Sequence, residues 1–251
     1  MSTYIAAAVI TFVFTALLTI AGVGAAFILI PIYIALGIDV RVAMAVALLL
    51  NSIAMAIASQ RFVRKRLVLF GVAMPILVVA SALSPLGAYT SRFVSRDVLL
   101  WLFVGFLVFA GSMMLFYQPR RREIRASLGK QLGYGAGVGA FAGYLGGLLG
   151  VGGGNFIVPV LVWLGIDPKN ASATTAFIVI FSSFSGFLGH ATLGHMDWHL
   201  LALTAVGSAA GSLVGAWLMT DRLKSPQVKK IIGVILYMIA ARMMWKLIAG
   251  G

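Results

Sequence analysis

The hydrophobic pattern of the chain consists of long apolar runs separated by short polar connections. Eight of these runs have roughly the 20 residues that a helix needs to cross a ~30 Å hydrocarbon core. They lie near residues 4–21, 43–60, 68–87, 97–117, 132–149, 172–190, 198–219 and 230–248. Two shorter apolar pieces, near residues 25–36 and 154–165, follow glycine clusters and reach only about half-way across a membrane as helices. The pattern predicts an all-α polytopic membrane protein with two half-helices.

The two halves of the sequence repeat one another. Adding 128 to a residue number in the first half gives its counterpart in the second, with ten identities in the 24 positions from residue 22 to residue 45. The identical positions are Gly22, Val23, Gly24, Pro31, Leu36, Gly37, Ile38, Asp39, Ala43 and Ala45. We therefore expect two transmembrane repeats, residues 1–117 and 132–251, each with a broken or re-entrant helix at its glycine cluster. A basic cytoplasmic linker, residues 118–131, joins them.

Glycine also recurs every four residues inside two of the predicted helices. The first series is Gly135, Gly139, Gly143 and Gly147, and the second is Gly207, Gly211 and Gly215. A helix that carries no side chains along one face lets another backbone come close, so each series predicts a tight helix–helix contact.

Composition agrees with a membrane protein and excludes several other classes. The 251 residues are 61% hydrophobic and 10% charged, with a mean hydropathy of +1.05, which is far from the composition of a soluble domain. The absence of cysteine removes disulfides and thiolate metal sites, and we expect no metal or cofactor. The net charge of +13 fits basic loops beside anionic lipid headgroups better than nucleic acid, because no soluble basic surface is predicted.

The distribution of Lys and Arg favours one arrangement of the two repeats. If each first helix and its half-helix form a hairpin that returns to the starting face, the repeats are inverted and the basic residues divide 14 against 5 between the faces. If the half-helix continues a single bent crossing, the repeats are parallel and the division is 11 against 8. Because short cytoplasmic loops concentrate Lys and Arg, inverted repeats are favoured, with both chain ends outside the cytoplasm.

The glycine clusters predict a substrate site. A half-helix N-terminus inside the membrane presents free backbone N–H groups and about half a positive charge, which suits an anion, and glycine lets the backbone approach that ligand. We expect a small anion between the two half-helices, with neutral polar side chains completing its site. The expected substrate-binding residues are Gly24, Ala25, Ala26, Asn51, Ser52, Gly152, Gly153, Gly154, Asn155, Thr174 and Thr175. Further hydroxyls, Ser182, Ser183 and Ser185, lie on the same predicted helix as Thr174.

These features also have simpler explanations. The glycines could serve only to let helices cross closely, and buried Ser and Thr in membrane helices often bond to helix carbonyls. His190 could act in gating or carry a proton, or it could be an interfacial residue. Asp39 and Asp167 stand at matching ends of the half-helices, where a cap or turn is expected.

The duplicated order of Gly-rich cluster, apolar run with proline and Gly-Ile-Asp, with a basic linker between the copies, resembles the sulfite exporter TauE/SafE family of membrane permeases. The resemblance covers essentially the whole chain. It implies transport of sulfite, an organosulfonate or a related sulfur anion across the bacterial inner (plasma) membrane. The first half departs from the pattern, because Ala25 and Ala26 stand where the second half has Gly153 and Gly154.

The sequence thus predicts a transporter that exports a small sulfur-containing anion by alternating access. An anion channel lined by the same half-helices and a membrane subunit without transport are the alternatives. An enzyme is not expected, because Ser185 and His190, the one tempting pair, lie about 140° apart around a helix. The partners considered are the anion, membrane lipids and, in a homo-oligomer, further copies of the chain.

Overall fold

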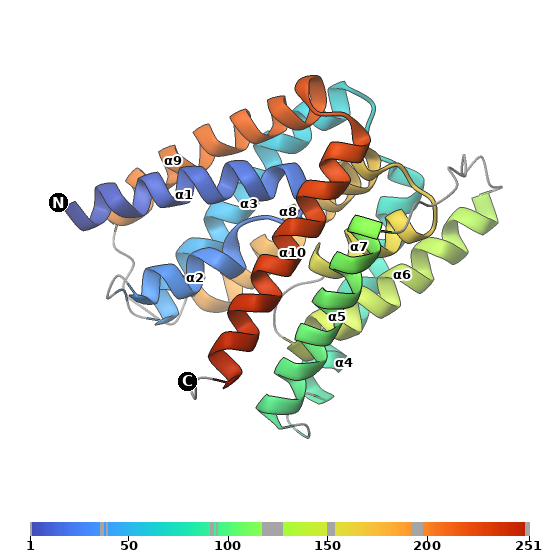
Figure 1. The fold of residues 1–251 in the computed structure, drawn as a ribbon, viewed down its shortest axis with the longest axis horizontal. Coiled ribbons are helices and arrows are strands. Elements are labelled where there is room, and N and C mark those ends of the chain that lie inside the picture. Colours follow the sequence, from blue (N-terminus) through green and yellow to red (C-terminus); the bar gives the residue numbers. More distant parts are fainter. Residues whose placement is uncertain are drawn as a thin grey trace. The chain divides into compact units, whose positions relative to one another are not determined.

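A computed structural model describes residues 2–35, 38, 40–90, 93, 95–116, 128–149, 154–191 and 198–248. Across these ranges the regular structure is entirely helical (Figure 1). The helices are α1 (Ser2–Ala21), α2 (Ala26–Ala35), α3 (Val40–Arg64), α4 (Phe70–Thr90), α5 (Arg96–Phe116), α6 (Leu128–Leu149), α7 (Gly154–Trp163), α8 (Pro168–Ala191), α9 (Trp198–Trp217) with a π-helical turn η2 (Leu218–Arg222), and α10 (Ser225–Ile248). All ten predicted helical pieces are therefore confirmed.

The two predicted short pieces, α2 and α7, are helices of ten residues each. Both end in the same way. The Ile38 N–H donates to the Tyr33 carbonyl and the Ile166 N–H to the Leu161 carbonyl, each over 3.0 Å, and the two bonds join counterparts at the 128-residue offset. Gly165 has a φ of +93°, which allows the chain to leave α7 through a left-handed residue. The end of each half-helix is thus part of the repeated pattern.

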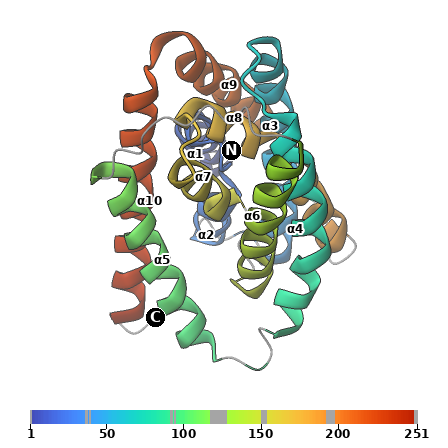
Figure 2. The same cartoon turned by 90° about the vertical axis from the view of Figure 1, so that its right-hand side faces the viewer.

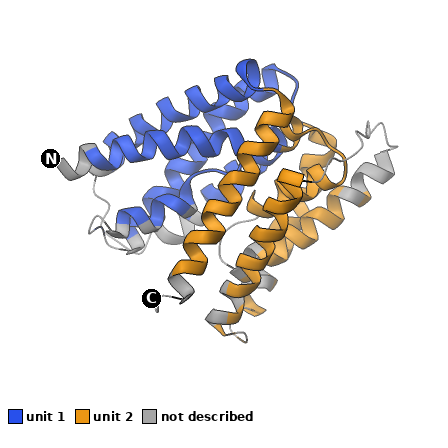
Figure 3. Ribbon diagram, viewed as in Figure 1, with its two compact units in different colours: residues 1–68, 172–223 blue, residues 69–171, 224–251 orange. Residues whose placement is uncertain are grey.

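The chain forms two compact units, and neither of them is a single sequence repeat (Figure 3). The first unit comprises residues 1–68 and 172–223, and the second comprises residues 69–171 and 224–251. In the first unit α1 packs along α9, and in the second α4 packs along α6. Each pair joins one helix of the first repeat to one of the second, so both repeats contribute to each unit.

In the first unit α1 and α9 run in the same direction and lie very close together (Figure 1). A Cβ atom on Gly207, Gly211 or Gly215 would lie 2.5, 2.4 or 2.3 Å from the carbonyl oxygen of Ala8, Phe12 or Ala16, respectively. Residue numbers rise together along both helices, which makes the pair parallel. The predicted tight contact of this glycine series is confirmed.

Helix α3 also runs parallel to α9. The Ser208 hydroxyl donates to the Leu50 carbonyl over 3.2 Å, and one turn later the Ser212 hydroxyl donates to the Ala54 carbonyl. Since α1 is parallel to α9 as well, α1 and α3 point the same way.

Helix α2, which connects α1 to α3 in the sequence, runs back along α1. The Tyr33 hydroxyl, near the end of α2, lies 2.6 Å from the Thr11 hydroxyl in the middle of α1. At the other end, the Val23 N–H donates to the Leu18 carbonyl over 3.3 Å as the chain leaves α1. The segment from Gly22 to Ala26 therefore reverses the direction of the chain.

In the second unit α4 and α6 are parallel, whereas α5 and α10 are antiparallel (Figure 2). Along α6 the glycines meet α4 in ascending order: a Cβ on Gly135, Gly139 or Gly143 would lie 2.8 Å from Pro75 Cβ, 2.9 Å from Ile76 O or 2.4 Å from Ala80 Cα, respectively. The contact predicted from this series is confirmed for these three positions. On α5 and α10, the Ser112 and Tyr237 hydroxyls are 2.5 Å apart, and a Cβ on Gly233 would lie 2.8 Å from Leu115.

Candidate functional site

The reversal between α1 and α2 depends on two glycines. Gly22 has a φ of +71° and Gly24 a φ of +83°, a region that side-chain-bearing residues rarely adopt. Space also excludes a side chain, because a Cβ would lie 2.1 Å from the Ser172 carbonyl oxygen at Gly22 and 2.0 Å from Asn51 Oδ1 at Gly24. The backbone therefore approaches α8 at the first position and an α3 side chain at the second.

Asn51 links the start of α2 to α3 and α8. Its Oδ1 accepts a hydrogen bond of 2.7 Å from the Ala25 N–H, and its Nδ2 donates one of 2.7 Å to the Ser183 Oγ. Only 4% of Asn51 is exposed. The amide thus occupies one of the N–H groups that a helix N-terminus leaves unpaired. The structure brings Gly24, Ala25 and Asn51, three of the expected substrate-binding residues, together around a neutral polar network.

Other predicted residues of this unit are buried nearby or on the same helices. Ser52 Oγ donates to the Ile180 carbonyl over 3.0 Å, a bond between counterparts at the 128-residue offset. Ala26 begins α2, and Thr174 and Thr175 lie fully buried on α8. The Thr175 hydroxyl has no partner among the described residues, and neither has that of Ser172, which the sequence did not single out. No periodic pattern in the sequence distinguishes Ser172. It stands out only through its contact with Gly22, which the structure shows.

In the second unit Gly154 and Asn155 form the buried start of α7. Asn155 is 2% exposed, and its Oδ1 has no partner within the described part of the chain. Phe156 fixes α7 in place, with ring centroids 4.5 Å from Phe106 and 5.8 Å from Phe103 of α5. Gly152, Gly153 and the side chain of His190 lie outside the described residues.

Asp167 is a helix cap, as predicted. Its Oδ1 accepts hydrogen bonds from the Lys169 N–H, at 3.0 Å, and from the Ser225 hydroxyl of α10, at 2.7 Å. It precedes Pro168, which suits the first position of α8 because proline lacks an N–H. Asp39, its counterpart, lies outside the described residues.

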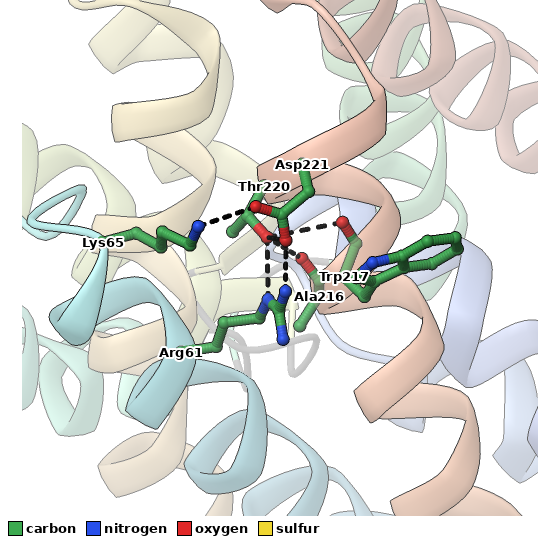
Figure 4. A network of polar contacts seen from close by, with 6 residues as sticks. All are labelled: Arg61, Lys65, Ala216, Trp217, Thr220 and Asp221. Atoms are coloured by element: carbon green, nitrogen blue, oxygen red, sulfur yellow. Dashed lines mark hydrogen bonds and ion pairs between the residues drawn. The ribbon is translucent and has the colours of Figure 1, made fainter.

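A charged network at the end of α3 was not predicted. Arg61 and Lys65 both point toward Asp221 of η2 (Figure 4). Lys65 Nζ lies 2.7 Å from Asp221 Oδ1, and Arg61 Nε donates to the Thr220 hydroxyl over 2.9 Å. Arg61 also pairs with the other carboxylate oxygen of Asp221. These contacts join residues about 156 to 160 positions apart in the sequence, so they tie the last turn of α3 to the last turn after α9.

Comparison with known families decides what kind of protein carries these features. The chain matches the family described as "Sulfite exporter TauE/SafE" over residues 6–243, nearly its whole length. The chain belongs to the TauE/SafE family. TauE/SafE proteins are membrane transporters and not enzymes, so the predicted family and the predicted class of protein are both confirmed.

Curated relatives carry related descriptions. "Probable membrane transporter protein YunE" of Bacillus subtilis is 27% identical over 181 residues, which are 65% of this chain and 66% of YunE. "Sulfite exporter TauE/SafE family protein 1" of Arabidopsis thaliana is 42% identical over 68 residues, 27% of this chain and 15% of that protein. The matches therefore span two thirds or less of the length of these relatives. No solved structure matches the chain.

The surface of this TauE/SafE protein fits a lipid environment. Two described helical stretches, Ala45–Arg64 and Leu201–Arg222, are long and apolar enough to cross a membrane by length and composition. Large apolar side chains are also exposed: Phe116 is 79% exposed, Trp245 76% and Val206 70%. In a membrane transporter such side chains can lie against lipid at no desolvation cost.

Proposed function

We propose that this TauE/SafE protein exports a small sulfur-containing anion, such as sulfite or an organosulfonate, across the bacterial inner membrane by alternating access. The family description and the name of the Arabidopsis relative support the substrate class. The similarity to YunE of Bacillus subtilis supports a bacterial plasma-membrane location.

The directions of three helices support a re-entrant hairpin and inverted repeats. Helices α1, α3 and α9 run the same way, and α2 turns back along α1. A bent single crossing would make α1 and α3 antiparallel, whereas a re-entrant hairpin of α1 and α2 makes them parallel. Helices α5 and α10 are counterparts in the two repeats, and counterparts run in opposite directions when the repeats are inverted. Their antiparallel packing therefore favours inverted repeats.

The charged network supports the same topology. Its ion pairs bring Arg61 and Lys65 next to Asp221, so the ends of α3 and α9 emerge together. Parallel repeats would separate these ends on opposite faces of the membrane. With inverted repeats both belong to the basic, cytoplasmic face.

The start of α2 then supplies an anion site within the first unit. The residues around it, Gly24, Ala25, Asn51 and Ser183, are uncharged, and the helix N-terminus contributes a partial positive charge. Neutral hydrogen-bond donors bind an anion less tightly than a buried arginine would, so the anion can dissociate again. We propose that the buried start of α7, at Gly154 and Asn155, provides a helix N-terminus of the same kind in the second unit.

Counterflow in reconstituted vesicles tests this function. Vesicles loaded with unlabelled sulfite are expected to take up radiolabelled sulfite faster than empty vesicles, because a carrier returns to the outside more readily with substrate bound. Uptake that is equal in loaded and empty vesicles would indicate a channel. The absence of uptake in both would indicate a subunit that does not transport sulfite.

A further inference from the structure

Several buried hydroxyls of the first unit have no hydrogen-bond partner among the described residues. Three of them lie within three residues of the contact between Gly22 and Ser172: Thr19 on α1, and Ser172 and Thr175 on α8. All three residues are fully buried. An unpaired hydroxyl inside a membrane protein costs free energy on the order of 1–3 kcal/mol. Three of them close to one contact therefore indicate a bound ligand that interacts with their oxygen atoms.

Backbone carbonyl groups of the same region are also available. The Gly22 N–H donates to the Thr19 carbonyl over 3.1 Å, and the Val23 N–H donates to the Leu18 carbonyl. Among the described residues, no backbone N–H donates to the carbonyls of Ile20 and Ala21. Both residues are at most 3% exposed. The C-terminal end of α1 therefore presents carbonyl oxygens, together with the negative end of its helix dipole, to the protein interior.

The contact between Gly22 and Ser172 brings these oxygens together. A Cβ on Gly22 would lie 2.1 Å from the Ser172 carbonyl oxygen. The next nearest atoms are C and Cα of Ser172, at 2.6 and 2.7 Å, so Gly22 lies against the α8 backbone where the turn from Ser172 to Thr175 begins. The end of α1 and this turn thus face each other, and all their available polar atoms are oxygens.

Oxygen atoms without a nearby carboxylate suit a monovalent cation. Mg²⁺ and Ca²⁺ are normally held by carboxylates, and the described residues contain no cluster of acidic or histidine side chains that could hold a metal ion. An anion is disfavoured, because carbonyl oxygens and a helix C-terminus repel it. In transporters with broken helices, unwound carbonyls and C-terminal helix ends coordinate the coupling ion, sodium or a proton, and a cluster of oxygens without an acidic side chain suits sodium.

We propose that a sodium ion binds at the C-terminal end of α1, held by the carbonyls of Ile20 and Ala21 and by the hydroxyls of Thr19, Ser172 and Thr175. The ion lies on one side of the Gly22–Gly24 turn, and the start of α2 lies on the other. An anion at the start of α2 and sodium at the end of α1 attract each other, so each raises the affinity for the other by the same factor. This coupling rests on the proposed function, whereas the sodium site itself does not.

Sodium-dependent stability of the purified full-length chain tests the site without any sulfur anion present. The thermal midpoint in nanodiscs is expected to rise with sodium chloride, relative to equal concentrations of choline chloride, and to saturate as a single site fills. Thr175→Val keeps the shape of the side chain but removes the hydroxyl, and it is expected to weaken the sodium affinity at least roughly tenfold. Ser172→Ala serves as a second variant should Thr175→Val fail to fold.

Thr15→Val is the matched control. Thr15 is also buried on α1 with an unpartnered hydroxyl, but it lies seven residues, or about 10 Å, before Gly22. This variant is expected to respond to sodium as the wild type does. Equal midpoints in sodium and choline, or a wild-type sodium response in both α8 variants, would overturn the proposal. Sulfite counterflow without sodium-dependent stability would leave transport standing and refute only the sodium site.

Discussion

Asn51→Asp is expected to leave the protein folded and to weaken anion binding at least ~100-fold. The carboxylate oxygen can accept the Ala25 N–H as the amide does, and a negative charge is favourable at the N-terminus of α2. The same charge repels a substrate anion, by on the order of 4 kcal/mol for charges ~4 Å apart at an effective dielectric constant of about 20. Isothermal titration with sulfite at pH 8, alongside thermal unfolding, measures both effects.

Asn51→Ala is the companion variant. It removes the cap of α2, which costs on the order of 1 kcal/mol of stability, but it adds no charge and frees the Ala25 N–H. We expect a lower thermal midpoint with anion binding retained within a few-fold. Asn51→Asp should therefore lose anion binding but stay stable, whereas Asn51→Ala should lose stability but keep anion binding. Wild-type sulfite affinity in Asn51→Asp would show that the anion does not bind at the start of α2.

Gly143→Ala is expected to destabilise the protein by roughly 1–3 kcal/mol, the usual cost of overpacking a tight contact. The added Cβ would lie 2.4 Å from Ala80 Cα and 2.6 Å from its carbonyl oxygen, both of which belong to the α4 backbone. Helices α4 and α6 would have to move apart, because backbone atoms cannot rotate away as side chains can. Thermal or denaturant unfolding in detergent measures the loss.

Gly137→Ala provides the control on the same helix. A Cβ at Gly137 would meet no atom within 4 Å, so only the helix propensity changes, in favour of alanine by about 0.5–1 kcal/mol. The two substitutions are chemically identical and should have effects of opposite sign. Equal effects would mean that the spacing of the glycines, and not the contact with α4, determines the stability.

The sequence predicts the helices of this protein well because each apolar run has a clear length. The half-helices α2 and α7 follow from runs that are too short to cross a membrane, and the glycine series identify the faces of α6 and α9 that pack closely. Glycine spacing contains no information on the partner helix, however. That α9 packs on α1 and α6 on α4, each across the two repeats, follows only from the structure.

The candidate site is predictable only in part. Asn51 stands out in the sequence as an amide inside an apolar run, but its bonds to Ala25 and Ser183 join residues 26 and 132 positions away. Ser172 resembles any small residue of a membrane helix until Gly22 is found against it. Asp221 likewise gives no sign of its two basic partners, because charge pairs over such separations depend on the tertiary fold.

The proposed topology requires the chain to turn back at Gly22–Gly24. Labelling of single cysteines tests this directly because the sequence contains no cysteine. Arg64 and Arg222 are both exposed, and Phe93, in the connection between α4 and α5, is 74% exposed. A membrane-impermeant thiol reagent added to intact cells and to inside-out vesicles reports the face of each substituted cysteine. We expect Arg64→Cys and Arg222→Cys to be labelled from the cytoplasmic side and Phe93→Cys from the other side. Labelling of Arg64→Cys and Arg222→Cys from opposite sides would make the repeats parallel and contradict the re-entrant hairpin.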